Sequence, residues 1–225
     1  MHVYERYRPA SQREVNDLVR EHPFALLVSA EPGAAPTATH VPMLLPADHE
    51  PDAPLVGAVM RGHMGRANPH WRQLVDGPVL LVFSTSQAYV SPTSYDPGPT
   101  APTLDYAAVH LTGRVELVGD PYVDPADRAG PPEPGTLGIV EATVEALESE
   151  RSQRWDPNGS EELFAKILPR VAAFRITIDS QQAMFKLSQE KTPEVRARIR
   201  ADLTSGPRLH HDVAGLMGKL DEVSS

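Results

Sequence analysis

The most regular pattern in the chain is an alternation of apolar and polar residues over Val109–Val118. Every second residue from Val109 to Leu117 is apolar or glycine, and those between are His110, Thr112, Arg114 and Glu116. Such alternation buries one face of a β-strand. Five further apolar runs bounded by Gly- and Pro-rich turns are predicted strands: Phe24–Ser29, Thr37–Leu45, Leu55–Met60, Pro78–Phe83 and Ala173–Ile178. Six short strands with turn-type links favour an antiparallel barrel over a doubly wound sheet.

Helical periodicity flanks the predicted strands. Ser11, followed three residues later by Glu14, is a capping-box pattern, and the next apolar positions give one face to a helix ending near His22. Later helices are predicted at Thr136–Glu150, Ser160–Leu168, Pro193–Leu203 and Asp212–Leu220, the third with Thr192 as its N-cap. Proline-rich segments at Asp96–Pro102 and Gly119–Gly135 are predicted loops. We therefore expect an α+β, mainly β, fold: one barrel domain over residues 1–225 with a C-terminal helical extension at about 192–221.

Composition and charge narrow the classes of function. The chain has 225 residues with 40% hydrophobic content, enough for a sizeable core. Its formal net charge of −9 argues against duplex DNA as a partner. The absence of cysteine excludes disulfides, zinc–thiolate sites, iron–sulfur clusters, thiolate-ligated haem and covalent haem attachment. No apolar run approaches a membrane span and the N-terminus lacks a signal-peptide core, so we expect a cytoplasmic protein.

The segment Gly62–Trp71, reading GHMGRANPHW, crowds chemically active side chains into ten residues. We predict that it turns from a strand into a helix over Met64–Leu74. The N–H groups at the start of such a helix, together with Arg66, would hold a phosphate or a propionate. Alternatively His63 caps a strand, Arg66 is solvated and Trp71 fills the core, but the crowding of these groups favours a functional site.

Three other clusters carry polar groups. Tyr89–Tyr95 places hydroxyls after an apolar strand, where they face a ligand or form an ordinary turn. Pro102–His110 leads a proline loop into a strand whose histidine is a ligand or, more simply, a satisfied strand residue. Met184–Glu190 sets a lysine between apolar neighbours, so this lysine is predicted to be partly desolvated and suited to ion pairing or proton transfer.

Together these clusters resemble a known family. GHMGRANPHW, AYVSP, the Pro-Thr-x-x-Tyr…Val-His…Gly-Arg segment starting at Pro102, and FKLSQ, in this order, resemble the PaiB-type family of FMN-binding negative transcriptional regulators from Tyr4 to about Arg200. The resemblance implies a dimeric FMN-binding split barrel with its cofactor at the subunit interface. The candidate cofactor-binding residues are His63, Arg66, Asn68, His70, Trp71, Ser91, Lys186 and Gln189.

The sequence departs from the regulator pattern where the cofactor would lie. That pattern carries Trp at the positions of Ser94 and Leu104, Asn at Asp105 and Glu190, and Lys at Met184. The changes remove two large rings and make the region three charge units more negative. A dianionic FMN phosphate is then less favoured, whereas a larger cofactor and a cationic substrate fit better.

A branch of the superfamily matches the altered residues better. His63-Met64, the segment Met184–Glu190 and the tail Val213–Met217 are similar to the piperazate synthases. This resemblance implies haem b rather than FMN as the cofactor, a homodimer, and N5-hydroxy-L-ornithine as the substrate. It implies cyclisation to L-piperazic acid by N–N bond formation with loss of water, without a membrane or nucleic-acid partner.

For the haem iron, His63 is the predicted axial ligand. The expected strand-to-helix turn would fix its direction, and Arg66, one helical turn on, would reach a propionate. His70 and His110 remain alternatives. Lys186, Glu190, Asp105 and Tyr89 are the candidate acids and bases, although Asp105 or Glu190 would serve equally to pair with a substrate ammonium. The rival functions are an FMN- and DNA-binding regulator and a flavin-dependent oxidoreductase.

Overall fold

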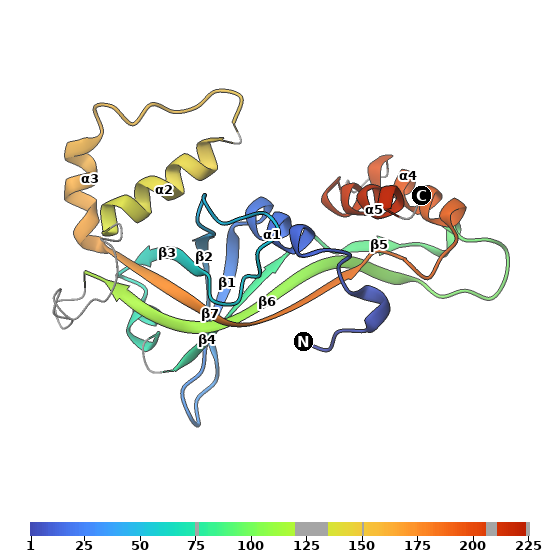
Figure 1. The fold of residues 1–225 in the computed structure, drawn as a ribbon, viewed down its shortest axis with the longest axis horizontal. Helices are drawn as coiled ribbons and strands as arrows, with labels where there is room; N and C mark the ends of the chain where they lie inside the picture. Colours follow the sequence, from blue (N-terminus) through green and yellow to red (C-terminus); the bar gives the residue numbers. More distant parts are fainter. Residues whose placement is uncertain (75–76, 120–134, 150, 206–210, 224–225) are drawn as a thin grey trace.

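The computed structural model describes residues 1–74, 77–119, 135–149, 151–205 and 211–223 (Figure 1). The strands are β1 (Phe24–Ser29), β2 (Thr37–Leu44), β3 (Val59–Gly65), β4 (Pro78–Ser84), β5 (Ala88–Val90), β6 (Thr103–Val118) and β7 (Val171–Lys186). The α-helices are α1 (Gln12–Glu21), α2 (Thr136–Ser149), α3 (Glu161–Ile167), α4 (Pro193–Ser205) and α5 (His211–Val223). Short 3-10 helices are η1 (Glu5–Tyr7), η2 (Pro69–Gln73), η3 (Pro92–Ser94) and η5 (Leu168–Arg170).

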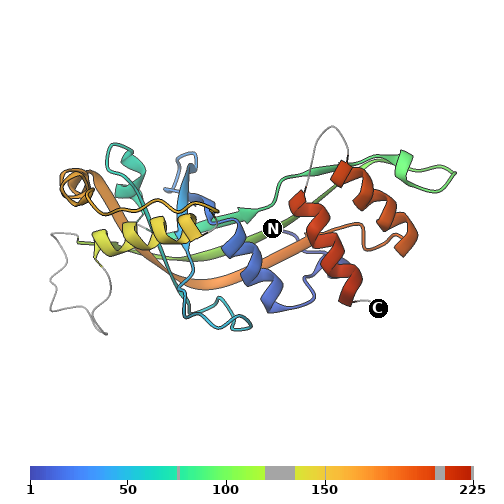
Figure 2. The ribbon, with the colours of Figure 1, turned by 90° about the horizontal axis from the view of Figure 1, so that it is seen from above.

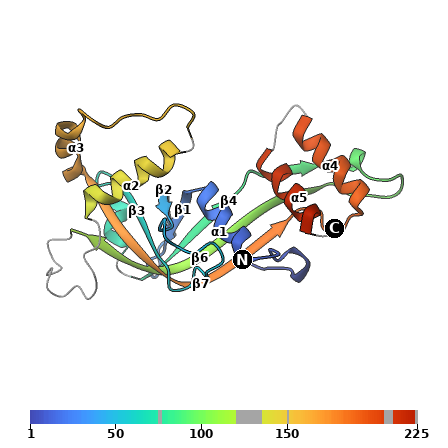
Figure 3. The same cartoon turned by 45° about the horizontal axis from the view of Figure 1, so that its top comes forward.

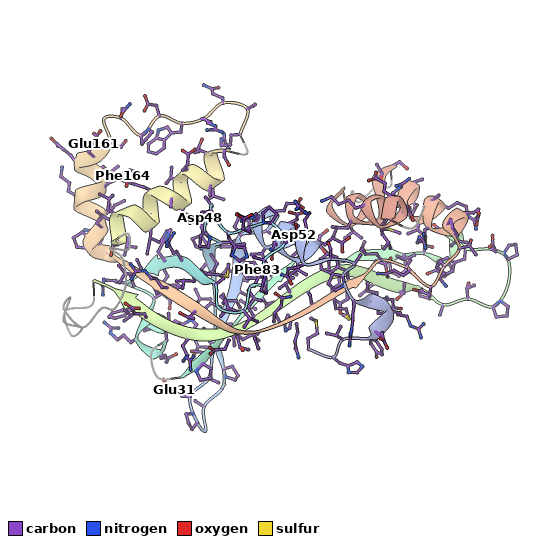
Figure 4. All side chains as sticks on the ribbon, viewed as in Figure 1. Glu31, Asp48, Asp52, Phe83, Glu161 and Phe164 are labelled. Carbon is purple, nitrogen blue, oxygen red and sulfur yellow. The ribbon has the colours of Figure 1, made fainter. Side chains whose placement is uncertain are left out.

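Six antiparallel strands close into a barrel. They follow the order β4-β1-β2-β3-β7-β6, and pairing between β4 and β6 completes the ring. The short strand β5 pairs with the first residues of β6 outside the ring. The interior is filled by large apolar side chains, among them the fully buried Phe83, labelled in Figure 4. The predicted antiparallel barrel with flanking helices is confirmed.

Two long strands set the shape of the molecule. β6 and β7 have 16 residues each and pair along nearly their whole length. They run from the region of α2 and α3 to that of α4 and α5, so these helix pairs lie at opposite ends of the ribbon (Figures 1 and 2). Polar groups near the two ends of β7 are therefore far apart within one chain.

Most of the predicted elements are confirmed, with shifted ends. β1 has the predicted bounds, β2 and β4 differ by one residue, and β6 and β7 extend well beyond the predicted segments. Ser11 caps α1 by accepting a hydrogen bond from the Glu14 backbone N–H, and Thr192 likewise accepts one at the start of α4. Residues 96–102 form a loop, as predicted. The loop expected at 119–135 lies mostly outside the described residues, as does Glu150.

The strand expected at residues 55–60 is wrong. β3 begins four residues later, at Val59, and residues 55–57 form a turn in which Gly57 has a φ of 88°. The continuous apolar run concealed this turn, because apolar residues also anchor turns against a core: Leu55 is fully buried although it lies outside the strand.

The helix expected at residues 64–74 is also wrong. β3 continues to Gly65, so His63 lies inside a strand and not at a strand-to-helix turn. Gly62 serves close packing, since a Cβ there would lie 2.3 Å from the Met43 sulfur. Only the 3-10 helix η2 follows, with Asn68 as its cap and Pro69 as its first residue.

Gly113 is expected to be essential for barrel stability. It lies where the pairing between β6 and β7 shifts register, and a Cβ there would be 2.4 Å from the Thr177 carbonyl oxygen. Because backbone cannot yield as a flexible side chain does, Gly113→Ala should lower the free energy of unfolding by about 2–4 kcal/mol in urea denaturation. The matched control is Gly65→Ala, whose Cβ would meet no atom within 4 Å. Equal stabilities of the two variants would contradict this packing argument.

None of the helices in the described ranges has the length and apolarity needed to cross a lipid bilayer.

Candidate functional site

A buried carboxylate lies at the end of the barrel covered by α4 and α5. Asp105 of β6 is completely buried, and the Ser188 hydroxyl donates to its Oδ2 at 2.6 Å. The Lys186 Nζ lies 3.6 Å from its Oδ1 and donates hydrogen bonds to the Thr103 hydroxyl and the Leu104 carbonyl. None of the described residues donates a hydrogen bond to Asp105 Oδ1. We call Asp105, Lys186 and Ser188 the carboxylate centre.

The environment of Asp105 prepares it for proton transfer. Burial raises the pKa of Asp105 to about 6, and the hydrogen bond from Ser188 and the positive charge of Lys186 only partly oppose this rise. The side chain of Lys186 is 18% exposed, which agrees with the predicted partial desolvation. A carboxyl group with this pKa both accepts and returns a proton near neutral pH.

Tyrosines surround the carboxylate centre. The Tyr95 hydroxyl is buried and has no hydrogen-bond partner in the described ranges, and the Lys191 Nζ lies 4.3 Å from the centroid of its ring. Burial raises the pKa of Tyr95, and the negative charges of Asp105 and Glu190 raise it further. The Tyr7 hydroxyl donates to Glu190 at 3.4 Å. Tyr95 and Asp105 Oδ1 are thus two buried polar groups without hydrogen bonds in one neighbourhood, which is typical of a site that binds a polar ligand.

Ser188 and Tyr95 were not predicted as site residues. Both lie inside polar clusters recognised in the sequence, but their roles depend on backbone geometry. Ser188 has a φ of 59°, in the left-handed region that is uncommon for residues other than glycine, and this directs its hydroxyl to Asp105. No sequence pattern gives that angle.

Three other predicted residues at this end have different surroundings. Tyr89 of β5 is 57% exposed and pairs in register with Leu104, which is 49% exposed. The Ser91 hydroxyl caps η3, and the Gln189 side chain accepts from the Leu187 N–H and donates to the Phe185 carbonyl. Ser91 and Gln189 therefore stabilise the turns that carry the site.

The second polar centre lies at the opposite end of β7. His63 of β3 pairs with Ala173, and its ring lies against Thr143 of α2. Figure 3 shows α2 beside β3. Burial lowers the pKa of His63, so its imidazole is neutral near pH 7. Its Nδ1 lies 3.5 Å from the Thr143 hydroxyl, and its Nε2 has no hydrogen-bond partner among the described residues. The ring thus has the state that a metal ligand requires.

Arg66 and Trp71 lie close to each other on the chain after β3. The Arg66 Nε donates to the Val171 carbonyl at 3.0 Å, while its terminal nitrogens have no hydrogen bond within the described part of the chain. The guanidinium carbons of Arg66 and Arg72 lie 4.8 and 4.7 Å from the Trp71 ring centroid. This pair of cations on one indole can hold an anionic group. We call His63, Arg66 and Trp71 the histidine centre.

His70 and Asn68, both predicted to bind the cofactor, use their polar side-chain atoms in hydrogen bonds within the protein. His70 is 1% exposed, and its Nε2 and Nδ1 are hydrogen-bonded to the hydroxyls of Ser29 and Thr39 at 2.9 and 2.8 Å. Neither nitrogen is then open to a metal. Asn68 caps η2 with its oxygen and donates to Thr39 through its amide nitrogen. Both residues instead tie η2 to the barrel.

His110, the third candidate ligand, and His40 are both strand residues. His110 of β6 is partly exposed, and burial lowers its pKa. His40 of β2 stacks on Phe24 with ring centroids 5.5 Å apart. No three His, Asp or Glu side chains gather into a metal-binding group within the described ranges.

The two centres are far apart in one chain. His63 is in register with Ala173, whereas Lys186 closes the other end of β7. The 13 residue-to-residue steps from Ala173 to Lys186 correspond to about 40 Å of extended strand. One chain therefore does not bring all the predicted site residues together.

Comparisons with known proteins give the class of this protein. The chain belongs to the putative FMN-binding domain family, whose sequence profile matches residues 1–180. Protease synthase and sporulation protein PAI 2 of Bacillus subtilis is 26% identical over 198 residues, covering 85% of this chain and 83% of that protein. The predicted membership of the PaiB-type split-barrel family is thus confirmed.

Two solved structures share the fold at lower identity. The flavocytochrome Anf3 from Azotobacter vinelandii has a TM-score of 0.51 and 16% identity, with 79% of this chain and 68% of that chain covered. The FAD and heme binding protein from Mycobacterium smegmatis has a TM-score of 0.50 and 18% identity, with 79% and 72% covered. These similarities establish a common split-barrel fold.

Proposed function

We propose that this protein is a haem-dependent cyclase that converts N5-hydroxy-L-ornithine into L-piperazic acid. The observation that carries the proposal is the carboxylate centre, where burial gives Asp105 a pKa of about 6 and leaves one of its oxygens without a hydrogen bond. The proposed substrate carries an ammonium group that must lose a proton before its nitrogen can react. A buried carboxylate both attracts that cation and accepts its proton.

The histidine centre fits haem. His63 has a neutral imidazole whose Nε2 bonds to none of the described residues, so it would hold the haem iron, and the guanidinium nitrogens of Arg66 that bond to none of them would suit a propionate. Two structures of this fold are named for haem as well as flavin, which supports the ability of the barrel to carry either cofactor. When bound, the haem iron supplies a Lewis acid that draws electron density from the hydroxylamine oxygen.

The residues of the carboxylate centre move the protons. Asp105 takes a proton from the α-ammonium, and the freed α-nitrogen bonds to N5 as the N5–O bond breaks. The hydroxyl leaves with a proton as water, returned by Asp105 or donated by Lys186. One N–N bond replaces one N–O bond and one water is lost, so the reaction requires no external oxidant or reductant. In this proposal Glu190 helps to bind the substrate ammonium, and Tyr89 lies at the outer edge of the same site.

The two centres act together if the protein is a homodimer with its sites at the subunit interface. The histidine centre of one chain would then lie against the carboxylate centre of its partner, which the separation along β7 prevents within one chain. The exposed pair Tyr89 and Leu104, beside the carboxylate centre, provides apolar surface for such a contact.

FMN binding is the second candidate. The family match and the two guanidinium groups on Trp71 favour a phosphate-bearing cofactor, and a flavin-dependent oxidoreductase or regulator would result. The carboxylate centre favours the cyclase, because in the proposed dimer a buried acid would lie beside the cofactor and disfavour a dianionic phosphate.

One experiment distinguishes these functions. The purified protein is reconstituted separately with haem b and with FMN, and its absorption spectrum is recorded after gel filtration. The haem-loaded protein is then incubated with N5-hydroxy-L-ornithine and analysed by mass spectrometry. We expect a retained Soret band and a product lighter by one water. Retention of FMN alone, or haem-loaded protein without product, would refute the cyclase.

A further inference from the structure

The hydrogen bonds of Thr143 in α2 restrict which ring nitrogen of His63 carries a proton. Thr143 of α2 is buried, with 4% exposure, and its hydroxyl donates to the Ile139 carbonyl at 2.8 Å. A hydroxyl has one proton, so towards His63 the Thr143 oxygen is an acceptor only. A hydrogen bond between this oxygen and the Nδ1 of His63, 3.5 Å away, therefore requires that Nδ1 carry the hydrogen.

We propose that Thr143 is a positioning residue that fixes the Nδ1–H tautomer of His63 and so presents an unprotonated Nε2 for a metal. This inference rests on the proposed function for the identity of the metal, but the choice of tautomer belongs to the protein alone. Ligating histidines characteristically donate their second ring N–H to a neighbouring acceptor, which fixes both tautomer and ring direction. Thr143 supplies that acceptor from a different element, α2, and not from the strand that carries His63.

The packing around the contact holds α2 in register. Ile139 is fully buried and clusters with Val118 of β6 and Ala173 of β7. Ala173 is the residue paired with His63 in the sheet, so the apolar cluster and the hydroxyl contact lie side by side. Ile139 and Thr143 are one helical turn apart and therefore face the sheet together. A helix anchored in this way determines where the Thr143 oxygen lies.

The test compares Thr143→Val with Thr143→Ser. Valine keeps the branched shape but removes the acceptor, whereas serine keeps the hydroxyl and loses a methyl group. In cofactor-free protein with 15N-labelled histidine, NMR reports which nitrogen of His63 is protonated. We expect the Nδ1–H form in the wild type and in Thr143→Ser, and a shift towards the Nε2–H form in Thr143→Val. An unchanged tautomer in Thr143→Val would overturn the proposal.

Haem titration gives the second measurement. Thr143→Val should lower haem affinity by about 10- to 100-fold, with Thr143→Ser close to the wild type. Circular dichroism melting of both variants controls for loss of fold. Equal haem affinity in all three proteins would overturn the role of Thr143 towards a metal. Failure of the wild type to bind haem would instead refute the proposed function, while the NMR comparison still decides the tautomer.

Discussion

Replacing Asp105 by asparagine is expected to abolish turnover while making the folded protein more stable at alkaline pH. Asparagine has nearly the same shape but neither binds an ammonium as a carboxylate does nor accepts its proton, so activity should fall by a factor of about 10² to 10⁴. Asparagine is also the residue of the regulator pattern at this position, so the barrel is expected to tolerate it. The product assay by mass spectrometry measures the first effect.

The stability effect follows from the sign of the pKa shift. The pKa of Asp105 is raised from an ordinary value of about 4 to about 6 in the folded protein. As the pH rises from 4 to 6, the unfolded chain releases this proton before the folded protein does, so the wild type loses stability, and the full loss persists above pH 6. The stability of Asp105→Asn relative to the wild type should therefore increase by about 2–3 kcal/mol between pH 4 and pH 8.

Urea denaturation of the cofactor-free proteins at both pH values measures this difference. The matched control is Asp179→Asn, which removes an exposed carboxylate that pairs with Arg114 at the surface. Its effect should stay within about 0.5 kcal/mol at either pH. A stability difference for Asp105→Asn that does not change with pH would contradict the raised pKa of Asp105.

Replacing His63 by alanine is expected to lower haem affinity at least about a hundredfold, because the protein loses its one direct bond to the iron. Haem titration followed at the Soret band measures this loss of affinity. His110→Ala is the matched control, since His110 is also a partly buried strand histidine with a lowered pKa. An unchanged Soret position and haem content in His63→Ala, with loss of both in His110→Ala, would reverse the axial assignment.

Co-expression of His63→Ala with Asp105→Asn extends this test to the interface. Each variant alone should be inactive. If a site combines His63 of one chain with Asp105 of its partner, a mixed dimer has one intact site, and a random mixture should recover roughly a quarter of wild-type activity. No recovery, despite mixed dimers shown by native mass spectrometry, would contradict a site shared between subunits.

The barrel was predictable because strand burial is a local property of sequence. The alternation at 109–118 matches the buried and exposed faces of β6, and β1 has the predicted bounds. Two elements within residues 55–74 were predicted wrongly. The apolar turn at 55–57 resembles a strand in sequence, and Gly62, which lets two core side chains approach, resembles a glycine that precedes a helix. The role of Gly62 is decided by its contacts with Met43 and Phe174, which are distant in sequence.

Five of the six residues that form the two centres were candidates from the sequence, whereas Ser188 and the chemical state of each group were not predictable. The clusters around His63, Asp105 and Lys186 were recognisable from residue types and spacing. The state of each group depends on tertiary contacts: two hydroxyls are hydrogen-bonded to the two ring nitrogens of His70, and the Thr143 hydroxyl lies 3.5 Å from the Nδ1 of His63. Protonation and ligand binding depend on burial and on partners that come from other elements.

Sequence by itself thus determined the fold class and the family and supplied a set of candidate site residues, because hydrophobic periodicity and motif spacing are written along the chain. Only the tertiary structure decided that Asp105 is fully buried with a raised pKa, that His63 lies within β3 beneath α2, and that the two centres occupy opposite ends of β7. These are properties of distance and solvent exclusion, which arise when strands remote in sequence close into a barrel.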